Sequence, residues 1–151
     1  MKNSLLINCL CLLLFVLCSS TKTGAVSSVQ TLFDTNNVSQ YSVLIKTEQA
    51  EISGIMLIKY IAGEWRGSLI NEFGVKAFDF VSPPGKCKLQ NTISFLDKWY
   101  IRRTVEADFA FLLWDAGRKV KGKSLEQFSD EKFVLKNEKR NIEYSFNYIE
   151  Q

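Results

Sequence analysis

The side chains that most often carry acid–base and nucleophilic chemistry are scarce in this sequence. Its 151 residues contain no histidine, which excludes His-based triads, His metal sites and the usual general base at neutral pH. Asp79 lies between Phe78 and Phe80, where an unpaired carboxylate would have a raised pKa, but a neighbouring lysine or arginine is the simpler expectation. No phosphate-binding glycine loop, CxxC pair or acidic calcium loop occurs. We therefore expect a protein that is not an enzyme and that uses no cofactor or metal.

The cysteines follow an export pattern rather than a disulfide pattern. The run "LLINCLCLLLFVLC" over residues 5–18 is apolar except for Asn8, and polar "SSTKTGAVSS" follows it, which predicts a secretory signal over residues 1–17. Cys18 ends the run and is predicted to become the lipid-modified first residue of a lipoprotein. Ordinary signal cleavage after Ala25 is the alternative. With Cys18 acylated, Cys87 has no partner and is interpreted as a small, half-buried strand residue.

A phenylalanine occupies a turn that should face water. In "NEFG" the sequence predicts a type I turn, with Asn71 first and Gly74 last in a left-handed conformation, so Glu72 and Phe73 form the corners. An exposed phenylalanine forfeits about 1.5–3 kcal/mol of burial. Phe73 therefore either folds back onto a neighbouring loop or contacts something apolar outside the protein.

The basic run "RKVKGK" over residues 118–123 carries four positive charges, in a chain whose formal net charge is +3. It is interpreted as a solvated loop, or as a segment attracted to anionic lipid headgroups at about 1 kcal/mol per basic residue. The mild overall charge and the predicted export do not favour nucleic acid as a partner.

The elements that would position these residues are mostly strands. Segments "YSVLIKT", "ISGIMLIKY", "EWRGSLIN", "VKAFDFV" and "KCKLQNTIS" predict a five-strand antiparallel meander, and "KFVLKN" and "NIEYSFNYIE" predict two more strands. Apolar residues occupy both faces of several strands, so one face needs a cover. A short helix is predicted over residues 29–35, and residues 118–131 are predicted to be a loop.

A long helix over residues 96–117 is the predicted cover. Asp97 is expected to cap its start, and Gly117 is expected to end it in a left-handed conformation. An apolar stripe marks the face that packs on the sheet, at Ile101, Val105, Phe109 and Leu112.

The export signal, the tether and the Asn-x-apolar-Gly hairpin at Asn71, Phe73 and Gly74 resemble the LolA/LolB family of periplasmic lipoprotein carriers and receptors, and LolB most closely. The resemblance covers about residues 53–94. It implies an incomplete antiparallel barrel closed by helices, with an apolar cavity that holds acyl chains, and it gives Phe73 the role of the protruding turn residue that helps transfer lipoproteins into the outer membrane. This chain is shorter than LolB, so a smaller or more open cavity is expected.

The predicted fold class is α+β, a curved antiparallel sheet (an incomplete β-barrel) of about seven strands covered by one main helix. Residues 18–40 form a tether with a short helix, and residues 41–151 form the lipid-binding domain. The predicted cavity residues are Ile55, Leu57, Trp65, Leu69, Phe78, Phe80, Val105, Phe109 and Leu112. A register slip of one residue would exchange the inward and outward sets.

The predicted function is non-catalytic binding of acyl chains or lipidated proteins by a monomer anchored through Cys18 to the periplasmic side of the outer membrane. A soluble periplasmic carrier is the alternative location. A second hypothesis is a lipid-anchored protein-interaction module without a ligand cavity, in which Phe73 contacts a partner protein. A third is an enzyme that uses Asp79 with a lysine.

Overall fold

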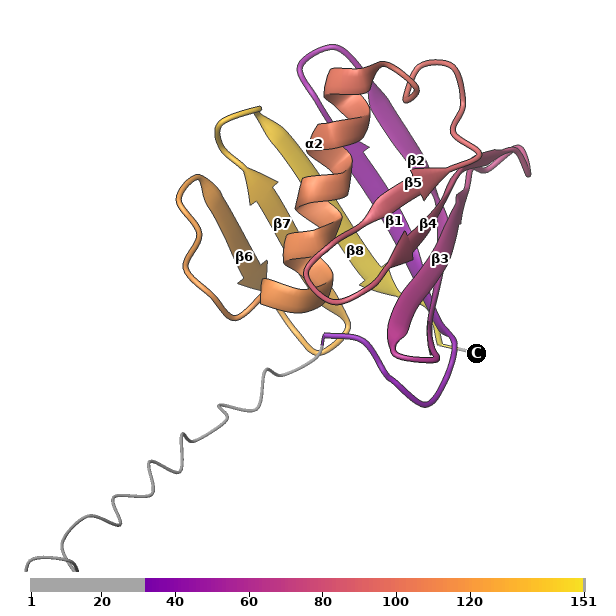
Figure 1. Ribbon diagram of the computed structural model, residues 1–151, viewed down its shortest axis with the longest axis vertical. Helices are drawn as coiled ribbons and strands as arrows, with labels where there is room; N and C mark the ends of the chain where they lie inside the picture. The colour runs from indigo at the N-terminus through magenta and orange to yellow at the C-terminus, as the bar shows by residue number, and fades with distance from the viewer. Residues whose placement is uncertain (1–31, 151) are drawn as a thin grey trace, which may run out of the picture.

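The structure is a computed structural model that describes residues 32–150, so the predicted signal sequence, Cys18 and Ala25 lie outside the described residues. One antiparallel sheet has the strand order β5-β4-β3-β2-β1-β8-β7-β6, and one long helix packs on it (Figure 1). The strands are β1 (Ser39–Lys46), β2 (Glu51–Ile61), β3 (Glu64–Ile70), β4 (Lys76–Ser82), β5 (Lys88–Gln90), β6 (Lys123–Gln127), β7 (Lys132–Asn137) and β8 (Ile142–Tyr148). The helix is α2 (Trp99–Ala110), which continues into a π-helical turn, η1 (Phe111–Asp115).

The predicted architecture, a curved antiparallel sheet with a helix on it, is confirmed, with eight strands rather than about seven. The additional strand is β6, within the segment predicted to be a loop. Its sequence "KSLEQ" has a single strongly apolar residue, so it carries no alternation signal, and its pairing with β7 is what makes it a strand. The last strand, β8, pairs with β1, with Phe146 opposite Val43, and so joins strands β1–β5 to strands β6 and β7.

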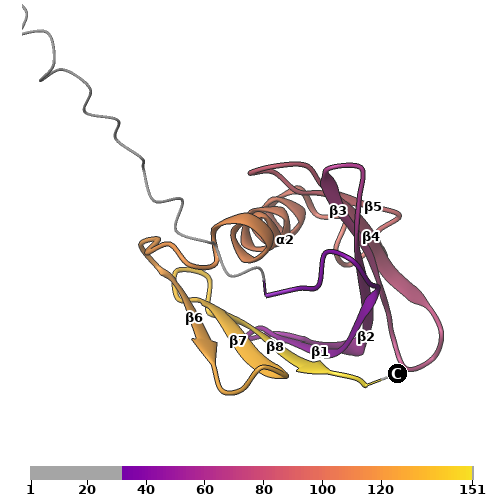
Figure 2. The same cartoon turned by 90° about the horizontal axis from the view of Figure 1, so that it is seen from below.

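The sheet bends around α2 without closing, and the helix occupies its concave side (Figure 2). Edge strand β5 is bound by helix side chains, because Leu89 donates its N–H to Glu106 Oε1 at 3.0 Å and its carbonyl accepts from Arg102 at 2.8 Å. On the opposite edge, Lys123 Nζ of β6 donates to the carbonyl of Ala107 at 2.7 Å. The helix therefore contacts both open edges of the sheet, and at β5 it pairs backbone groups of Leu89 that the edge would otherwise leave unpaired.

The core lies between α2 and the sheet and is rich in aromatic rings. Phe109 of the helix packs against Phe78, Phe80 and Tyr144, with ring centroids 5.6, 5.3 and 6.0 Å apart. Phe33 is also buried, 5.8 Å from the ring of Trp65, so the chain ahead of β1 already belongs to the packed structure.

The predicted apolar stripe of the helix is confirmed, since Val105, Phe109 and Leu112 are buried and Ile101 packs against the core. The π-helical turn adds an extra residue to one turn, and as a result Phe111, Leu112 and Leu113 are all buried.

Three expectations about the helices were wrong. The helix begins after Lys98, and Asp97 makes no cap; its carboxylate instead accepts from Thr92 and Arg102 at 3.1 and 3.2 Å. Gly117 does not have a positive φ angle, so it does not end the helix in a left-handed conformation. Residues 32–35, the described part of the predicted short helix, form bends and irregular structure without a helical turn.

Candidate functional site

The predicted cavity under the helix is filled by the side chains that were expected to line it. Seven of the nine are buried in the core, with at most 3% of their surface exposed: Trp65, Leu69, Phe78, Phe80, Val105, Phe109 and Leu112. They pack on one another and on their neighbours, so the centre of the sheet is a side-chain core.

The inward face of β2 was predicted wrongly. Ile55 is 47% exposed and Leu57 lies on the outer face, whereas Met56 and Ile58 are fully buried. Met56 pairs with the buried Tyr41 of β1, and this register sets the inward face of the strand. Neighbouring side chains in a strand point to opposite faces of the sheet, so assigning the wrong face to β2 misplaced Ile55 and Leu57 together.

An apolar recess of about 230 Å³ remains at one end of the sheet, between the first turns of α2 and the β1–β2 turn. Val105 is the single member of the predicted cavity set that lines it. Polar groups at its mouth come from the β1–β2 turn, from Lys98 and from Arg140, and Tyr144 contributes to its inner wall. Its apolar lining comes mainly from Ile45, Ile52, Phe95, Ile101 and Ile142.

The recess opens at the end of the sheet where several turns gather, here called the recess end. Antiparallel pairing places the β1–β2 turn (residues 47–50), the β3–β4 turn (residues 71–75) and the β7–β8 turn (residues 138–141) at this end, where α2 also begins (Figure 1). Phe73 therefore lies at the same end of the molecule as the recess.

The β3–β4 turn has the geometry that its sequence predicts. Asn71 Oδ1 accepts from the N–H groups of Phe73 and Val75 at 3.0 and 2.8 Å, and Gly74 has a φ of 77°. With its backbone held in this way, Phe73 is 81% exposed, so its ring does not fold back onto a neighbouring loop. Single exposed apolar side chains are common on protein surfaces, so the exposure of Phe73 does not by itself indicate a partner.

A second hollow, here called the basic groove, lies beside the recess between α2 and the turns before β6 and after β7. Its volume is about 550 Å³. Tyr100, Thr104 and Arg140 line both hollows, so the recess and the groove share a wall. The basic residues along the groove are Arg103, Lys121, Lys123, Lys139 and Arg140.

The floor of the basic groove is a buried polar network around Asp108, which is 0% exposed. Its carboxylate accepts from Lys123 Nζ at 2.8 Å, from Asn137 Nδ2 at 2.8 and 3.0 Å, and from the Tyr144 hydroxyl at 2.8 Å. Burial, together with the charge and the hydrogen bond of Asp108, raises the pKa of Tyr144 well above its ordinary value. The network ties α2 to β6, β7 and β8.

This network was not among the predictions from the sequence. Its one sequence signal is that Asp108 falls on the apolar stripe of the helix, between Val105 and Leu112, where a charge is expected to be buried and paired. Its partners, Asn137 and Tyr144, lie 29 and 36 residues further along the chain, so no local pattern indicates them.

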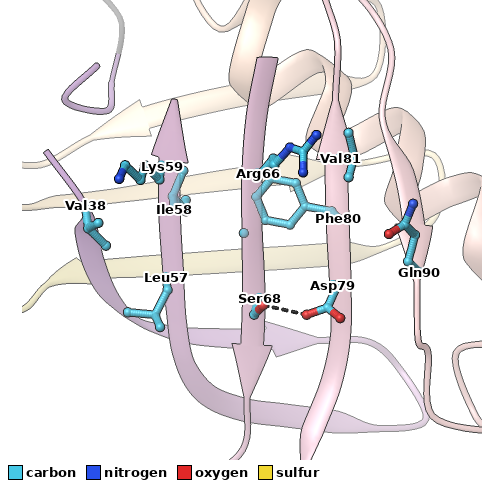
Figure 3. Close-up of a pocket in the computed structure, with 11 residues that line it drawn as sticks. Val38, Leu57, Ile58, Lys59, Arg66, Ser68, Asp79, Phe80, Val81 and Gln90 are labelled. Atoms are coloured by element: carbon cyan, nitrogen blue, oxygen red, sulfur yellow. Dashed lines mark hydrogen bonds between the residues drawn. The ribbon is translucent and has the colours of Figure 1, made fainter. Parts of the chain in front are cut away.

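Asp79 lies in a third hollow, of about 320 Å³, on the outer face of β2, β3 and β4 (Figure 3). The Ser68 hydroxyl donates to one carboxylate oxygen of Asp79, and Lys76 Nζ and Asn91 Nδ2 donate to the other at 3.0 and 2.7 Å. Burial raises the pKa of Asp79, but these hydrogen bonds and the charge of Lys76 outweigh it and hold the pKa below its usual range. The expected lysine partner is present, and the carboxylate is fully hydrogen-bonded.

Over residues 32–150, no group of three or more His, Cys, Asp or Glu side chains could hold a metal ion. Within the same residues, no helix combines the length and the hydropathy that crossing a membrane requires. No protein-family model matches this chain, and no curated protein matches it.

Proposed function

We propose that this protein binds an acyl chain, of a lipid or of a lipidated protein, without catalysing a reaction, and that the chain enters the recess at the recess end. The observation that carries the proposal is an apolar recess of about 230 Å³ at the same end of the sheet as the exposed Phe73. Export, anchoring through Cys18 and a role in lipoprotein localisation at the outer membrane are parts of the same proposal, supported by the signal-like sequence and by the resemblance of the "NEFG" turn to LolB.

The size of the recess limits what it holds. Pockets for drug-sized ligands usually occupy about 300–1,000 Å³, so this recess suits part of one hydrocarbon chain rather than a whole lipid. Each methylene transferred from water into it would contribute about 0.8 kcal/mol. The filled core under the helix means that a longer chain would extend outward, over the exposed apolar side chains of the recess end.

A partner protein is the second candidate ligand, favoured by a different observation. The core is packed with side chains, and large apolar residues are exposed at the recess end instead, among them Phe73 and Trp99. In that case the recess would receive an apolar side chain of the partner. A partner that copurifies stably without lipid supports this candidate, and lipid that mass spectrometry detects in extracts of the purified protein supports acyl-chain binding.

The test fills the recess and measures the binding of a fluorescent long-chain fatty acid. Ile101 lines the recess from α2, and the larger ring in Ile101→Trp would occupy the space of the ligand. We expect Ile101→Trp to weaken fatty-acid binding by about tenfold or more, a loss of about 1.4 kcal/mol.

Ile61→Trp is the matched control, because Ile61 is exposed at the opposite end of β2. It should bind the fatty acid like the original chain, and the two variants should have similar circular dichroism spectra. Equal binding by both variants, or no binding by the original chain, would contradict the proposal.

A further inference from the structure

We propose that the bound amphiphile carries an anionic headgroup, which the basic groove holds while the acyl chain occupies the recess. This inference rests on the proposed function and specifies the chemical class of its ligand. It follows from the position of the two hollows on either side of one wall, formed by Tyr100, Thr104 and Arg140. A single-chain molecule crossing this wall would have its apolar part on one side and its polar part on the other.

The positive charge of the groove is not neutralised by its own floor. Asp108 is the single acidic residue that lines the groove, and its carboxylate already accepts hydrogen bonds from Lys123, Asn137 and Tyr144. Lys123 has little capacity left for a ligand, because its ammonium group also donates to the carbonyl of Ala107 and lies 5.5 Å from the centre of the Phe111 ring.

Four further cations line the groove without an acidic partner within residues 32–150: Arg103, Lys121, Lys139 and Arg140. A group of cations with no internal counter-charge favours an external anion, and guanidinium and ammonium groups together suit phosphate oxygens. The charge of the groove and the apolar lining of the recess thus complement the two parts of an anionic amphiphile.

Local backbone geometry directs Lys139 toward the groove. Its aliphatic part crosses Gly122, so closely that a Cβ on Gly122 would lie 2.7 Å from Lys139 Cγ. Gly122 also has a φ of 81°, which favours glycine, and its carbonyl accepts the N–H of Glu138 at 3.0 Å. The two turns are therefore held together at the groove.

Exposed aromatic rings complete the site. Trp99 and Tyr100 both line the groove and are exposed at the start of α2, next to the mouth of the recess. Tryptophan and tyrosine suit the boundary between an apolar chain and a polar headgroup, because each has an apolar ring with a polar atom.

The experiment compares three probes that separate the headgroup from the chain. Lysophosphatidylglycerol is anionic, lysophosphatidylcholine has the same acyl chain with a zwitterionic headgroup, and glycerol phosphate has the anion without a chain. We expect lysophosphatidylglycerol to bind about tenfold more tightly than lysophosphatidylcholine, a preference that decreases as salt screens the groove. Glycerol phosphate should bind more weakly than either.

The variant that tests the groove is Lys139→Gln with Arg140→Gln, two exposed turn residues. It should reduce the preference for lysophosphatidylglycerol to less than about threefold, because it weakens binding of the anionic lysolipid more than binding of lysophosphatidylcholine, whose acyl chain also passes Arg140. The control, Lys59→Gln with Lys88→Gln, removes two exposed charges from the outer face of the sheet and should keep the preference. Lys121→Gln gives an independent loss of preference if the double variant is unstable.

The outcomes separate this inference from the function on which it rests. Equal binding of the two lysolipids by the original chain would overturn the anionic headgroup alone and leave acyl-chain binding intact. Binding of neither lysolipid would overturn both. If glycerol phosphate binds as tightly as lysophosphatidylglycerol, the groove is a site for free phosphate, and the proposal that the ligand is an amphiphile is overturned.

Discussion

Cys87 illustrates how burial controls the chemistry of a single residue. It lies directly before β5, 7% exposed, and is the one cysteine within the described residues. Burial raises the pKa of its thiol to about 12, the negative charge of Glu106 adds to this rise, and a hydrogen bond with Ser82 opposes it. Since the thiolate is the reactive form, Cys87 is a core residue rather than a nucleophile.

We therefore expect slow alkylation of Cys87 and a loss of stability at high pH. Iodoacetamide at pH 8 should modify Cys87 at least roughly a hundredfold more slowly in the folded protein than in urea, measured by mass spectrometry of the peptide that contains it. The folded pKa is raised, so the folded state binds more protons than the unfolded state between the ordinary thiol pKa of 9.0 and about 12. The free energy of unfolding should fall as the pH rises through this range.

Cys87→Ala removes this titration and should reduce the decrease in stability above pH 9 without abolishing it, because burial also raises the pKa of Tyr41 to about 12. Rapid alkylation of Cys87 in the folded protein would show that the thiol is accessible and would contradict the prediction.

At the scale of elements, the Asp108 network joins α2 to β6, β7 and β8. Strands β2 to β5 contact the helix through apolar side chains such as Phe78 and Phe80, and β5 also through hydrogen bonds between Leu89 and the helix side chains. Strands β6, β7 and β8 instead each supply one side chain that donates to the buried carboxylate of Asp108 in α2. Removing one partner of a buried ion pair leaves the other charge uncompensated, which is more costly than losing an exposed pair.

We expect Asp108→Ala to reduce the free energy of unfolding by about 3–5 kcal/mol, because Lys123, whose side chain is 15% exposed, would lose its counter-charge. The matched control is Asp115→Ala, which breaks the exposed pair with Arg118 and should cost about 1 kcal/mol or less. Urea denaturation followed by circular dichroism measures both values. Similar losses in the two variants would show that the buried network does not fasten the helix.

How far the sequence predicts each element depends on how local its signal is. The stripe at Val105, Phe109 and Leu112 repeats within a few turns of helix, and it was predicted correctly. In β2 the segment "GIMLIKY" is apolar on both faces, so alternation alone could not choose between the Ile55 and Met56 sets. That choice is made by the partner strand β1, where Tyr41 and Val43 are buried.

The β3–β4 hairpin contains one feature that the sequence predicts, its turn, and one that it does not, a bulge. Its turn was predicted from Asn71 and Gly74, whose roles are local. Its second strand begins with a bulge opposite Leu69 and Ile70, and as a result Ala77 and Phe78 are buried although they are adjacent in sequence. Phe78 was correctly predicted to face inward, but a bulge changes the alternation without leaving a clear mark in the sequence, so the burial of Ala77 beside it could not be derived.

At the scale of the whole molecule, the two ends of the sheet differ in what accompanies their exposed apolar side chains. Phe73 and Trp99 are exposed at the recess end, with the recess and the basic groove beside them. The opposite end also exposes a large ring, Phe128, in the β6–β7 turn. Exposure alone therefore does not identify the lipid-binding end, and a test must compare the two ends directly.

Tryptophan fluorescence makes this comparison, because the three tryptophans differ in exposure. Trp65 is buried, Trp114 is partly buried and donates to Ser82, and Trp99 is 74% exposed at the recess end. In a chain with Cys18→Ser, which removes any acyl anchor, vesicles that contain phosphatidylglycerol and brominated lipid should quench mainly Trp99. Quenching should be lost in Trp99→Phe and reduced in Phe73→Ser, because Phe73 would enter the apolar layer with the same end.

The control moves the probe to the other end. Phe128→Trp, combined with Trp99→Phe, keeps one exposed tryptophan but places it in the β6–β7 turn, where it should remain unquenched. If this variant is quenched as strongly as the original chain, the protein meets the lipid without a preferred end. The recess would then not face the bilayer, and direct transfer of an acyl chain from the membrane into it would lose its geometric basis.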